Sequence, residues 1–170
     1  MRLLPLALLG LATLAACDSN DPEPDTVFGD AVNADSTACL DGELTVEILD
    51  PSPNGQALAS PILSLDYVGT RRPLGVGMSG EFSFEFDRGS FVEDDVRVTV
   101  AGFQNGILGT TDIEPMRIGE RRQITIPPNL AYGFPGLRDR TGQFVLDEEG
   151  NVLVPQCATL RFDVTLQDFN

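Results

Sequence analysis

The chain has 170 residues and a net charge of −15, with 26 acidic side chains against 11 basic ones, and every basic residue is Arg. It contains no His, which excludes His-based zinc sites, Ser-His and Cys-His nucleophile systems and imidazole general bases. The acidic balance argues against a surface that binds nucleic acid or anionic lipid. A hydrophobic content of 42% over this length allows one globular domain with short extensions.

Residues 1–16 have the form of an export signal. One positive charge at Arg2 is followed by an apolar run from Leu3 to Leu14 and then by small residues, and this run is too short to span a bilayer. The run ends in Leu14-Ala15-Ala16-Cys17, which resembles a bacterial lipobox. We therefore expect cleavage before Cys17, acylation of that residue, and a lipoprotein held by its acyl chains on a membrane of the bacterial cell envelope, on the periplasmic or the surface face. An ordinary secretory signal whose cleavage site precedes a Cys is the alternative.

Residues 17–38 are predicted to be a flexible tether. Positions 18–37 hold six acidic residues and no basic one, so mutual repulsion keeps this stretch extended. Beyond it, Cys39 and Cys157 form an even pair in an exported chain, which predicts a disulfide. Two unrelated buried thiols are the alternative. The folded domain is expected to cover residues 39–170.

Six stretches alternate apolar and polar residues with the period of a half-buried antiparallel strand. In chain order they are residues 44–49, 62–68, 81–86, 96–100, 122–126 and 159–167. Only Ala101–Leu108 has helical spacing, with Phe103 and Ile107 four positions apart. The predicted fold class is therefore α+β, with one antiparallel sheet of about five to six strands packed against one short helix.

Four blocks carry specific motifs. Residues 116–133 are M-R-I-G-E-R-R-Q-I-T-I-P-P-N-L-A-Y-G, and residues 158–164 are A-T-L-R-F-D-V. Residues 65–69 (LDYVG) and 98–106 (VTVAGFQNG) complete the set. Taken from the first to the last along the chain, the four blocks resemble motifs of the FKBP-type peptidyl-prolyl isomerases. These motifs are, in the same order, V-x-Y-T-G, V-I-x-G-W-x-x-G, M-x-V-G-x-K/R-R-x-L-T-I-P-P-x-L-A-Y-G and A-T-L-x-F-x-V. The resemblance extends over about residues 62–170, and its longest motif is highly specific.

The resemblance implies an FKBP-like half-barrel of strands wrapped on the helix, with an apolar, aromatic-lined pocket for a proline ring. Rotation about an X-Pro bond has a barrier of about 20 kcal/mol because the amide is conjugated. A dry pocket that holds the ring and donates hydrogen bonds to the rotated carbonyl lowers this barrier without a nucleophile, metal or cofactor. The site residues implied are Tyr67, Phe82, Thr99, Val100, Phe103, Tyr132, Val154 and Phe162.

Among these, the implied catalytic residues are Tyr132, Tyr67 and Phe103. Phe103 would form the pocket floor, where the family most often has Trp, and Tyr132 would donate its hydroxyl to the substrate carbonyl. The backbone of Thr99 and Val100 would hold the bound chain. The expected partners are proline-containing polypeptides among exported or surface proteins, bound by a monomeric domain.

Two departures from the family pattern bear on function. The family carries Phe-Asp a few residues after its Tyr-x-Gly strand, and Thr70–Gly80 contains neither residue, which predicts weakened catalysis. The alternative function is therefore a catalytically weak chaperone or binding module of the same fold. Residues 134–154 form a longer loop than the family's, with a hairpin signal around residues 147–150. This hairpin is expected to be a lid, an acidic docking surface or a surface decoration.

Three further interpretations concern an extra stretch, two arginines and the overall charge. The stretch Asp87–Asp95 is expected to be an insertion between the Phe-rich strand and the helix. Arg121 and Arg122 stand at a strand start and are expected to face solvent. Abundant Asp without Lys is typical of proteins from high-salt environments, so the halophile-like composition predicts a fold whose stability rises with salt.

Overall fold

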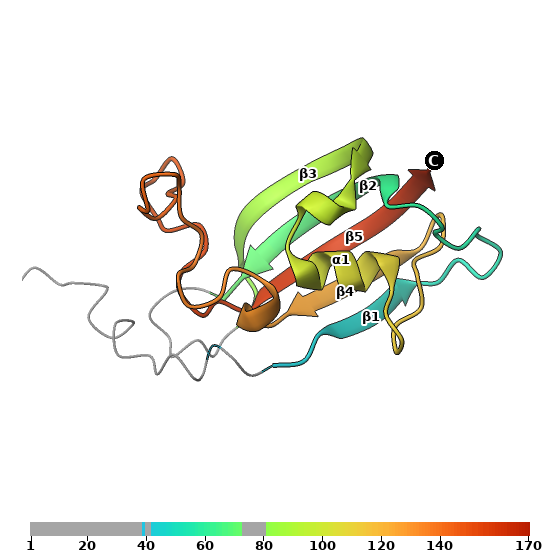
Figure 1. Cartoon of the computed structure of the whole chain (residues 1–170), viewed down its shortest axis with the longest axis horizontal. Helices are drawn as coiled ribbons and strands as arrows, with labels where there is room; N and C mark the ends of the chain where they lie inside the picture. The colour runs from blue at the N-terminus through green and yellow to red at the C-terminus, as the bar shows by residue number, and fades with distance from the viewer. Residues whose placement is uncertain (1–38, 40–41, 73–80) are drawn as a thin grey trace, which may run out of the picture.

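The computed structural model describes residues 39, 42–72 and 81–170 (Figure 1). The predicted signal peptide at 1–16, the lipidation site Cys17 and the tether up to residue 38 lie outside the described residues, as do residues 73–80 of the segment searched for Phe-Asp. Among the residues described, no helix is both long enough and apolar enough to cross a membrane.

Five antiparallel strands form one sheet with the order β1-β4-β5-β2-β3. Their bounds are Thr45–Asp50 for β1, Ile62–Arg71 for β2, Phe84–Asp95 for β3, Arg121–Ile126 for β4 and Leu160–Phe169 for β5. The central strand β5 pairs with both β4 and β2, and its even-numbered residues from Leu160 to Leu166 are buried. This strict alternation gives the sheet one inner face that the rest of the domain covers.

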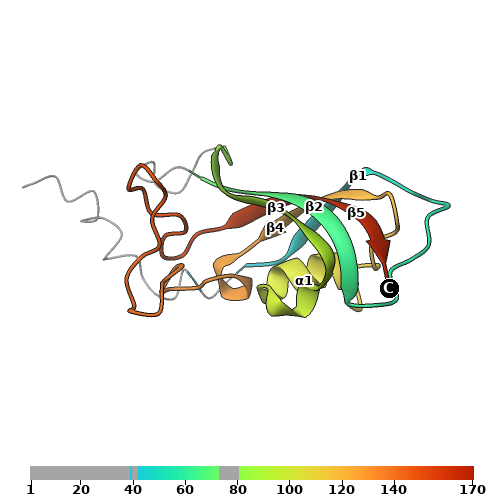
Figure 2. The same ribbon diagram turned by 90° about the horizontal axis from the view of Figure 1, so that it is seen from above.

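The inner face is covered by one α-helix, α1 (Ala101–Leu108), over which the strands curve (Figures 1 and 2). The helix comes close to β4 because Gly106 has no side chain. A Cβ at this position would lie 2.7 Å from two side-chain carbons of Ile124. The predicted fold class and the predicted helix are thus confirmed, and the sheet has five strands.

The predicted strand at residues 96–100 is wrong. The carboxylate of Asp95 accepts a hydrogen bond from the backbone N–H of Arg97 at 2.9 Å and begins a short 3₁₀ helix, η2 (Val96–Val98). This local side-chain cap competes with strand pairing and overrides a short apolar alternation. The strand before it, β3, extends to Asp95, so residues 87–95, expected to be an insertion, are part of the sheet.

The prediction that Arg122 faces solvent is also wrong. Arg122 is 2% exposed and lies on the same side of β4 as the buried Ile124. Its guanidinium forms an ion pair with the equally buried Glu120. It also donates to the backbone carbonyls of Gly106 at 3.0 Å, Glu114 at 2.8 Å and Pro115 at 3.2 Å. Burial is tolerated because the donors of this cation are satisfied.

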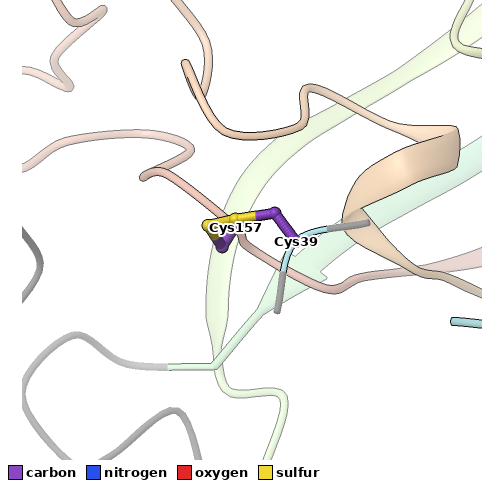
Figure 3. Close-up of a disulfide and its surroundings, with 2 residues drawn as sticks. All are labelled: Cys39 and Cys157. Carbon is purple, nitrogen blue, oxygen red and sulfur yellow. A yellow bond between two sulfur atoms is a disulfide. The ribbon is translucent and has the colours of Figure 1, made fainter. Parts of the chain in front are cut away.

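The structure contains the predicted disulfide between Cys39 and Cys157 (Figure 3). The two residues are 118 positions apart and both are buried. Cys157 also donates its backbone N–H to the carbonyl of Gly133 at 3.0 Å. The bridge therefore ties the start of the described domain to the segment that leads into β5.

The loop at residues 134–154 projects beyond the end of the sheet at which β5 begins (Figure 1). The predicted hairpin is present but short, and its two arms are joined by one antiparallel β-bridge between Leu146 and Val152. The N–H of Asp147 donates to the carbonyl of Asn151 at 2.9 Å across the turn. Within this fully described loop, the pairing does not extend into a regular strand.

Candidate active site

Five aromatic rings gather between the sheet and α1. Tyr67 comes from β2, Phe86 and Phe91 from β3, Phe103 from α1 and Phe162 from β5. The Phe103 ring is the centre of the cluster, since its centroid lies 4.8 Å from that of Phe162, 5.9 Å from that of Tyr67 and 6.3 Å from that of Phe91. Phe86 meets Phe162 edge to face at 5.5 Å. Such tilted pairs stabilise one another beyond the area that they bury.

A glycine in β2 makes room for these rings. Strand alternation places Gly69 on the same face as Tyr67. A Cβ at Gly69 would lie 2.8 Å from a ring carbon of Phe162 and 2.9 Å from one of Phe86. Any side chain here would push the two rings apart, so Gly69 is required for the shape of the cluster.

A β-bulge brings two consecutive residues of β3 to the inner face. Gly69 pairs with Asp87 and Thr70 pairs with Glu85, so Phe86 is the extra residue between two register positions. In a regular strand, neighbouring side chains point to opposite faces, and a bulge relaxes this rule. As a result, Phe86 packs on Phe162 while Asp87 reaches Tyr67.

The hydroxyl of Tyr67 donates a hydrogen bond to Oδ2 of Asp87 at 3.1 Å. Burial raises the pKa of Tyr67 from 10.0 to about 12, with further contributions from the charge of Asp87, the hydrogen bond to it and the nearby Tyr132. Opposite on β3 is Gly89, where a Cβ would lie 2.9 Å from the Tyr67 hydroxyl. The pair therefore joins a neutral phenol to a carboxylate at the edge of the ring cluster.

Tyr132 lies in the loop after the short 3₁₀ helix η3 (Pro128–Leu130) and packs, half-buried, against the core. Burial, and then the negative charge of Asp87, raise the pKa of Tyr132, so its hydroxyl stays protonated. Among the described residues this hydroxyl has no hydrogen-bond partner. The hydroxyl of Tyr67 thus donates to Asp87, whereas the hydroxyl of Tyr132 remains free to donate.

The segment before α1 is held in place by its own hydrogen bonds. The hydroxyl of Thr99 donates to the carbonyl of Val96 at 2.7 Å, and its carbonyl accepts from Nε2 of Gln104 at 2.6 Å. Val100 is the N-cap of α1, and its carbonyl accepts from the N–H of Phe103 at 3.0 Å. Within the described part of the chain the N–H of Val100 makes no hydrogen bond, so it is a second free donor.

The structure brings most of the sequence-derived site residues together. Tyr67, Phe103 and Phe162 are in ring contact. The same core includes Val100, Tyr132 and the buried Val154. Thr99 lies next to them at the start of α1.

Phe82 does not join this group, and its assignment to the pocket is corrected. Its ring lies 4.0 Å from the guanidinium carbon of Arg161 and 4.8 Å from that of Arg72. Arg161 alternates with the buried Phe162 and so faces the other side of the sheet. Phe82 precedes β3, which begins at Phe84, so the strand alternation expected for this stretch does not extend to it.

The sequence interpretation missed Phe86, Asp87 and Phe91. It looked for a Phe-Asp pair between residues 70 and 80, but Phe86-Asp87 is such a pair, and its Asp lies 20 positions after Tyr67. The available signal was the dipeptide itself, further along the chain than expected. The absence of Phe-Asp from residues 70–80 therefore no longer argues for weakened catalysis.

An open groove of about 450 Å³ is lined by outward-facing side chains of the sheet and also by Tyr67 and Gly89. Asp66 and Asp163 line it together with Arg88 and Arg121. A groove with both charges and open to water does not suit a proline ring, so the aromatic cluster remains the candidate site. The described residues contain no group of three or more His, Cys, Asp or Glu side chains that could hold a metal ion.

Comparison with known proteins gives concordant results. A chloroplastic Arabidopsis thaliana protein named peptidyl-prolyl cis-trans isomerase FKBP13 is 33% identical over 85 residues, which are 49% of this chain and 37% of the relative. A Corynebacterium glutamicum protein named "Probable FK506-binding protein" is 41% identical over 71 residues, 39% of this chain and 55% of the relative. The chain thus spans about half or less of the length of these two relatives.

The fold is also similar to a solved structure, described as the crystal structure of AtFKBP13. The TM-score is 0.55 at 25% identity, and the match covers 75% of this chain and 93% of the other. At the level of sequence families, residues 58–167 match FKBP-type peptidyl-prolyl cis-trans isomerase. This match covers more than half of the chain, which therefore belongs to the FKBP family.

Proposed function

We propose that this chain is a peptidyl-prolyl cis-trans isomerase that rotates X-Pro bonds at the aromatic cluster. The observation that carries the proposal is the Tyr67–Asp87 hydrogen bond beside the rings centred on Phe103. Two free donors, the Tyr132 hydroxyl and the Val100 N–H, border the same core. An apolar surface with a few directed donors is what a proline ring and its preceding carbonyl require.

The chemistry follows from the amide bond itself. The ground-state X-Pro amide is planar and polar, and the twisted transition state loses conjugation and much of that polarity. An apolar surface against Phe103 stabilises the less polar state relative to water, and the hydroxyl of Tyr132 donates to the carbonyl as it rotates. Asp87 orients Tyr67 and places a negative charge at the edge of the ring cluster. In this proposal that charge faces the amide carbon, which becomes more ketone-like and more electrophilic as conjugation is lost. No covalent step is required.

The proposed substrates are proline-containing segments of exported or surface proteins as they fold. The export signal at residues 1–16 and the lipobox ending at Cys17 support this location. The Cys39–Cys157 disulfide fits an oxidising compartment outside the cytoplasm. In this proposal the acidic tether allows the domain to reach chains near the membrane that holds Cys17, and the domain acts as a monomer.

The test is a prolyl-peptide isomerisation assay on residues 18–170 and three variants. We expect Tyr132→Phe and Phe103→Ala to lower kcat/KM, because they remove a donor and the central ring. Phe82→Ala is the matched control, since this Phe lies outside the cluster, and should retain activity. A wild-type rate equal to the uncatalysed one would favour the binding module instead. If Phe82→Ala were the most damaging variant, the site would be misplaced.

A further inference from the structure

Arg71 ends β2 and is buried, with 2% of its surface exposed. Its Nε donates to the carbonyl of Leu153 at 2.6 Å, and one terminal nitrogen donates to that of Val152 at 2.5 Å. The other terminal nitrogen donates to the carbonyl of Arg72 at 3.0 Å. The guanidinium carbon also lies 3.6 Å from the ring centroid of Phe84, its cross-strand partner.

None of the ion pairs among the described residues includes Arg71. Desolvation lowers the pKa of Arg71, and the charge of Asp147 offsets this only in part. A buried cation without an ion pair is costly unless its donors are satisfied. The two loop carbonyls, from Val152 and Leu153, are therefore needed to hold this side chain, and the side chain in turn holds the loop.

Backbone hydrogen bonds connect the residues that Arg71 holds to the rest of the 134–154 loop. The N–H of Leu153 donates to the carbonyl of Val145 at 2.9 Å, and that of Val145 donates to Leu137 at 3.2 Å. Leu137 donates in turn to the carbonyl of Val154 at 2.9 Å and packs on the core that also holds Tyr132. Fixing residues 152 and 153 thus fixes three passes of the loop beside the candidate site.

One strand face carries both the site and the loop contact. Tyr67 and Arg71 are four positions apart on β2 and point to the same side of the sheet. The loop lies beyond that end of the sheet (Figure 1). Arg71 therefore ties residues 152 and 153 of the loop to the strand that carries Tyr67.

We propose that Arg71 is a positioning residue that docks the 134–154 loop onto the strand of Tyr67 and so strengthens the binding of polypeptides that extend beyond the proline. This inference rests on the proposed function, since it assigns the loop to substrate binding at that site. It predicts an effect on long substrates that short ones do not share.

The test compares the full chain, purified in mild detergent, with its Arg71→Met variant. Arg138→Met is the matched control. Arg138 also stacks on a ring, that of Phe144 at 3.9 Å, and donates to two loop carbonyls, those of Pro135 and Gly142. All of these partners belong to the loop itself, so this control perturbs the loop without undocking it.

For Arg71→Met we expect faster hydrogen exchange at the amides of Leu137, Val145 and Leu153, while the amides of β5 stay protected. The KM for a long prolyl peptide should rise roughly tenfold, as expected when the docked loop falls to about a tenth of the population. The KM for a prolyl tetrapeptide and kcat for both peptides should stay unchanged. Arg138→Met should leave the KM for the long peptide unchanged.

Three results would overturn the proposal: loop amides that stay protected in Arg71→Met, faster exchange with an unchanged KM for the long peptide, or an equal KM effect from Arg138→Met. If Arg71→Met does not fold, Arg71→Lys keeps the charge and one donor, and should give a smaller change of the same kind. An inactive wild-type chain would defeat the proposed function. The Kd of the long peptide, measured by calorimetry, would then still test Arg71.

Discussion

The Tyr67–Asp87 hydrogen bond gives Tyr67 a titration that can be observed directly. Its pKa is about 12 rather than 10.0, because burial, the charge of Asp87 and the hydrogen bond all disfavour the phenolate. The chain has two Tyr and no Trp. In a Tyr132→Phe variant, tyrosinate absorbance therefore reports the ionisation of Tyr67 alone.

In this background we replace Asp87 by Asn, which keeps an acceptor oxygen of the same size and removes the charge. Burial is the largest cause of the raised pKa and remains, so the midpoint should fall below that of the Tyr132→Phe parent but stay above 10.0. Asp66→Asn is the matched control. Asp66 is the neighbour of Tyr67 in β2, but its carboxylate bonds to Ser90 and Gln167, away from the Tyr67 hydroxyl. This variant should keep the midpoint of the Tyr132→Phe parent.

The same pKa determines a dependence of stability on pH. A phenol whose pKa is raised in the folded state contributes stability that is fully present below the unfolded pKa. This contribution should be lost as the pH rises from about 10 to about 12. Circular dichroism at each pH separates ionisation within the fold from unfolding. A midpoint near 10 in the folded wild type, or one unchanged by Asp87→Asn, would refute the assigned contact.

Three further predictions concern stability. Gly106→Ala should lower the free energy of unfolding in urea by about 1–3 kcal/mol, because the added Cβ meets Ile124; no loss would mean that α1 can move away from β4. Reducing the Cys39–Cys157 bridge should lower it by up to about 5 kcal/mol in the chain-entropy account, and titration of two free thiols in the untreated protein would contradict the bridge. The melting temperature should rise between about 0.1 and 2 M salt if self-repulsion limits stability; coincident melting curves would argue against the halophile-like interpretation.

The parts of the fold that depend on local pattern could be predicted from the sequence. The apolar-polar alternation of residues 159–167 identifies the central strand β5, and the helical spacing of Phe103 and Ile107 identifies α1. Both patterns are local because their periods follow from backbone geometry. Tyr67, Tyr132 and Phe162 were found through motifs. Each of these residues is placed by its own local segment, which is β2, the loop after η3 or β5, so motif position and spatial position agree.

The parts that depend on distant partners could not be predicted. Asp87 reaches Tyr67 only because β3 has a bulge opposite Gly69, and a bulge is defined by the pairing of two strands. Arg122 is buried because carbonyls of residues 106, 114 and 115 satisfy it. Neither the bulge nor this set of carbonyls has a local signal. Period-two alternation places Arg122 on the face of Ile124 and Ile126, but the carbonyls that allow a cation to be buried there come from other segments of the chain.

The strong negative charge and the apolar site coexist because strand alternation separates them. Among the described residues, Asp87 is the one carboxylate whose charge raises the pKa of Tyr67 and of Tyr132. On the same strand Asp87 itself and Glu85, Glu93 and Asp94 are all exposed, where water and salt screen them. The proline ring is neutral and the rotating amide becomes less polar. The site therefore needs the single carboxylate of Asp87 and not the summed electrostatic potential of many acidic side chains. Salt is therefore expected to act on the stability of this fold far more than on the binding of proline.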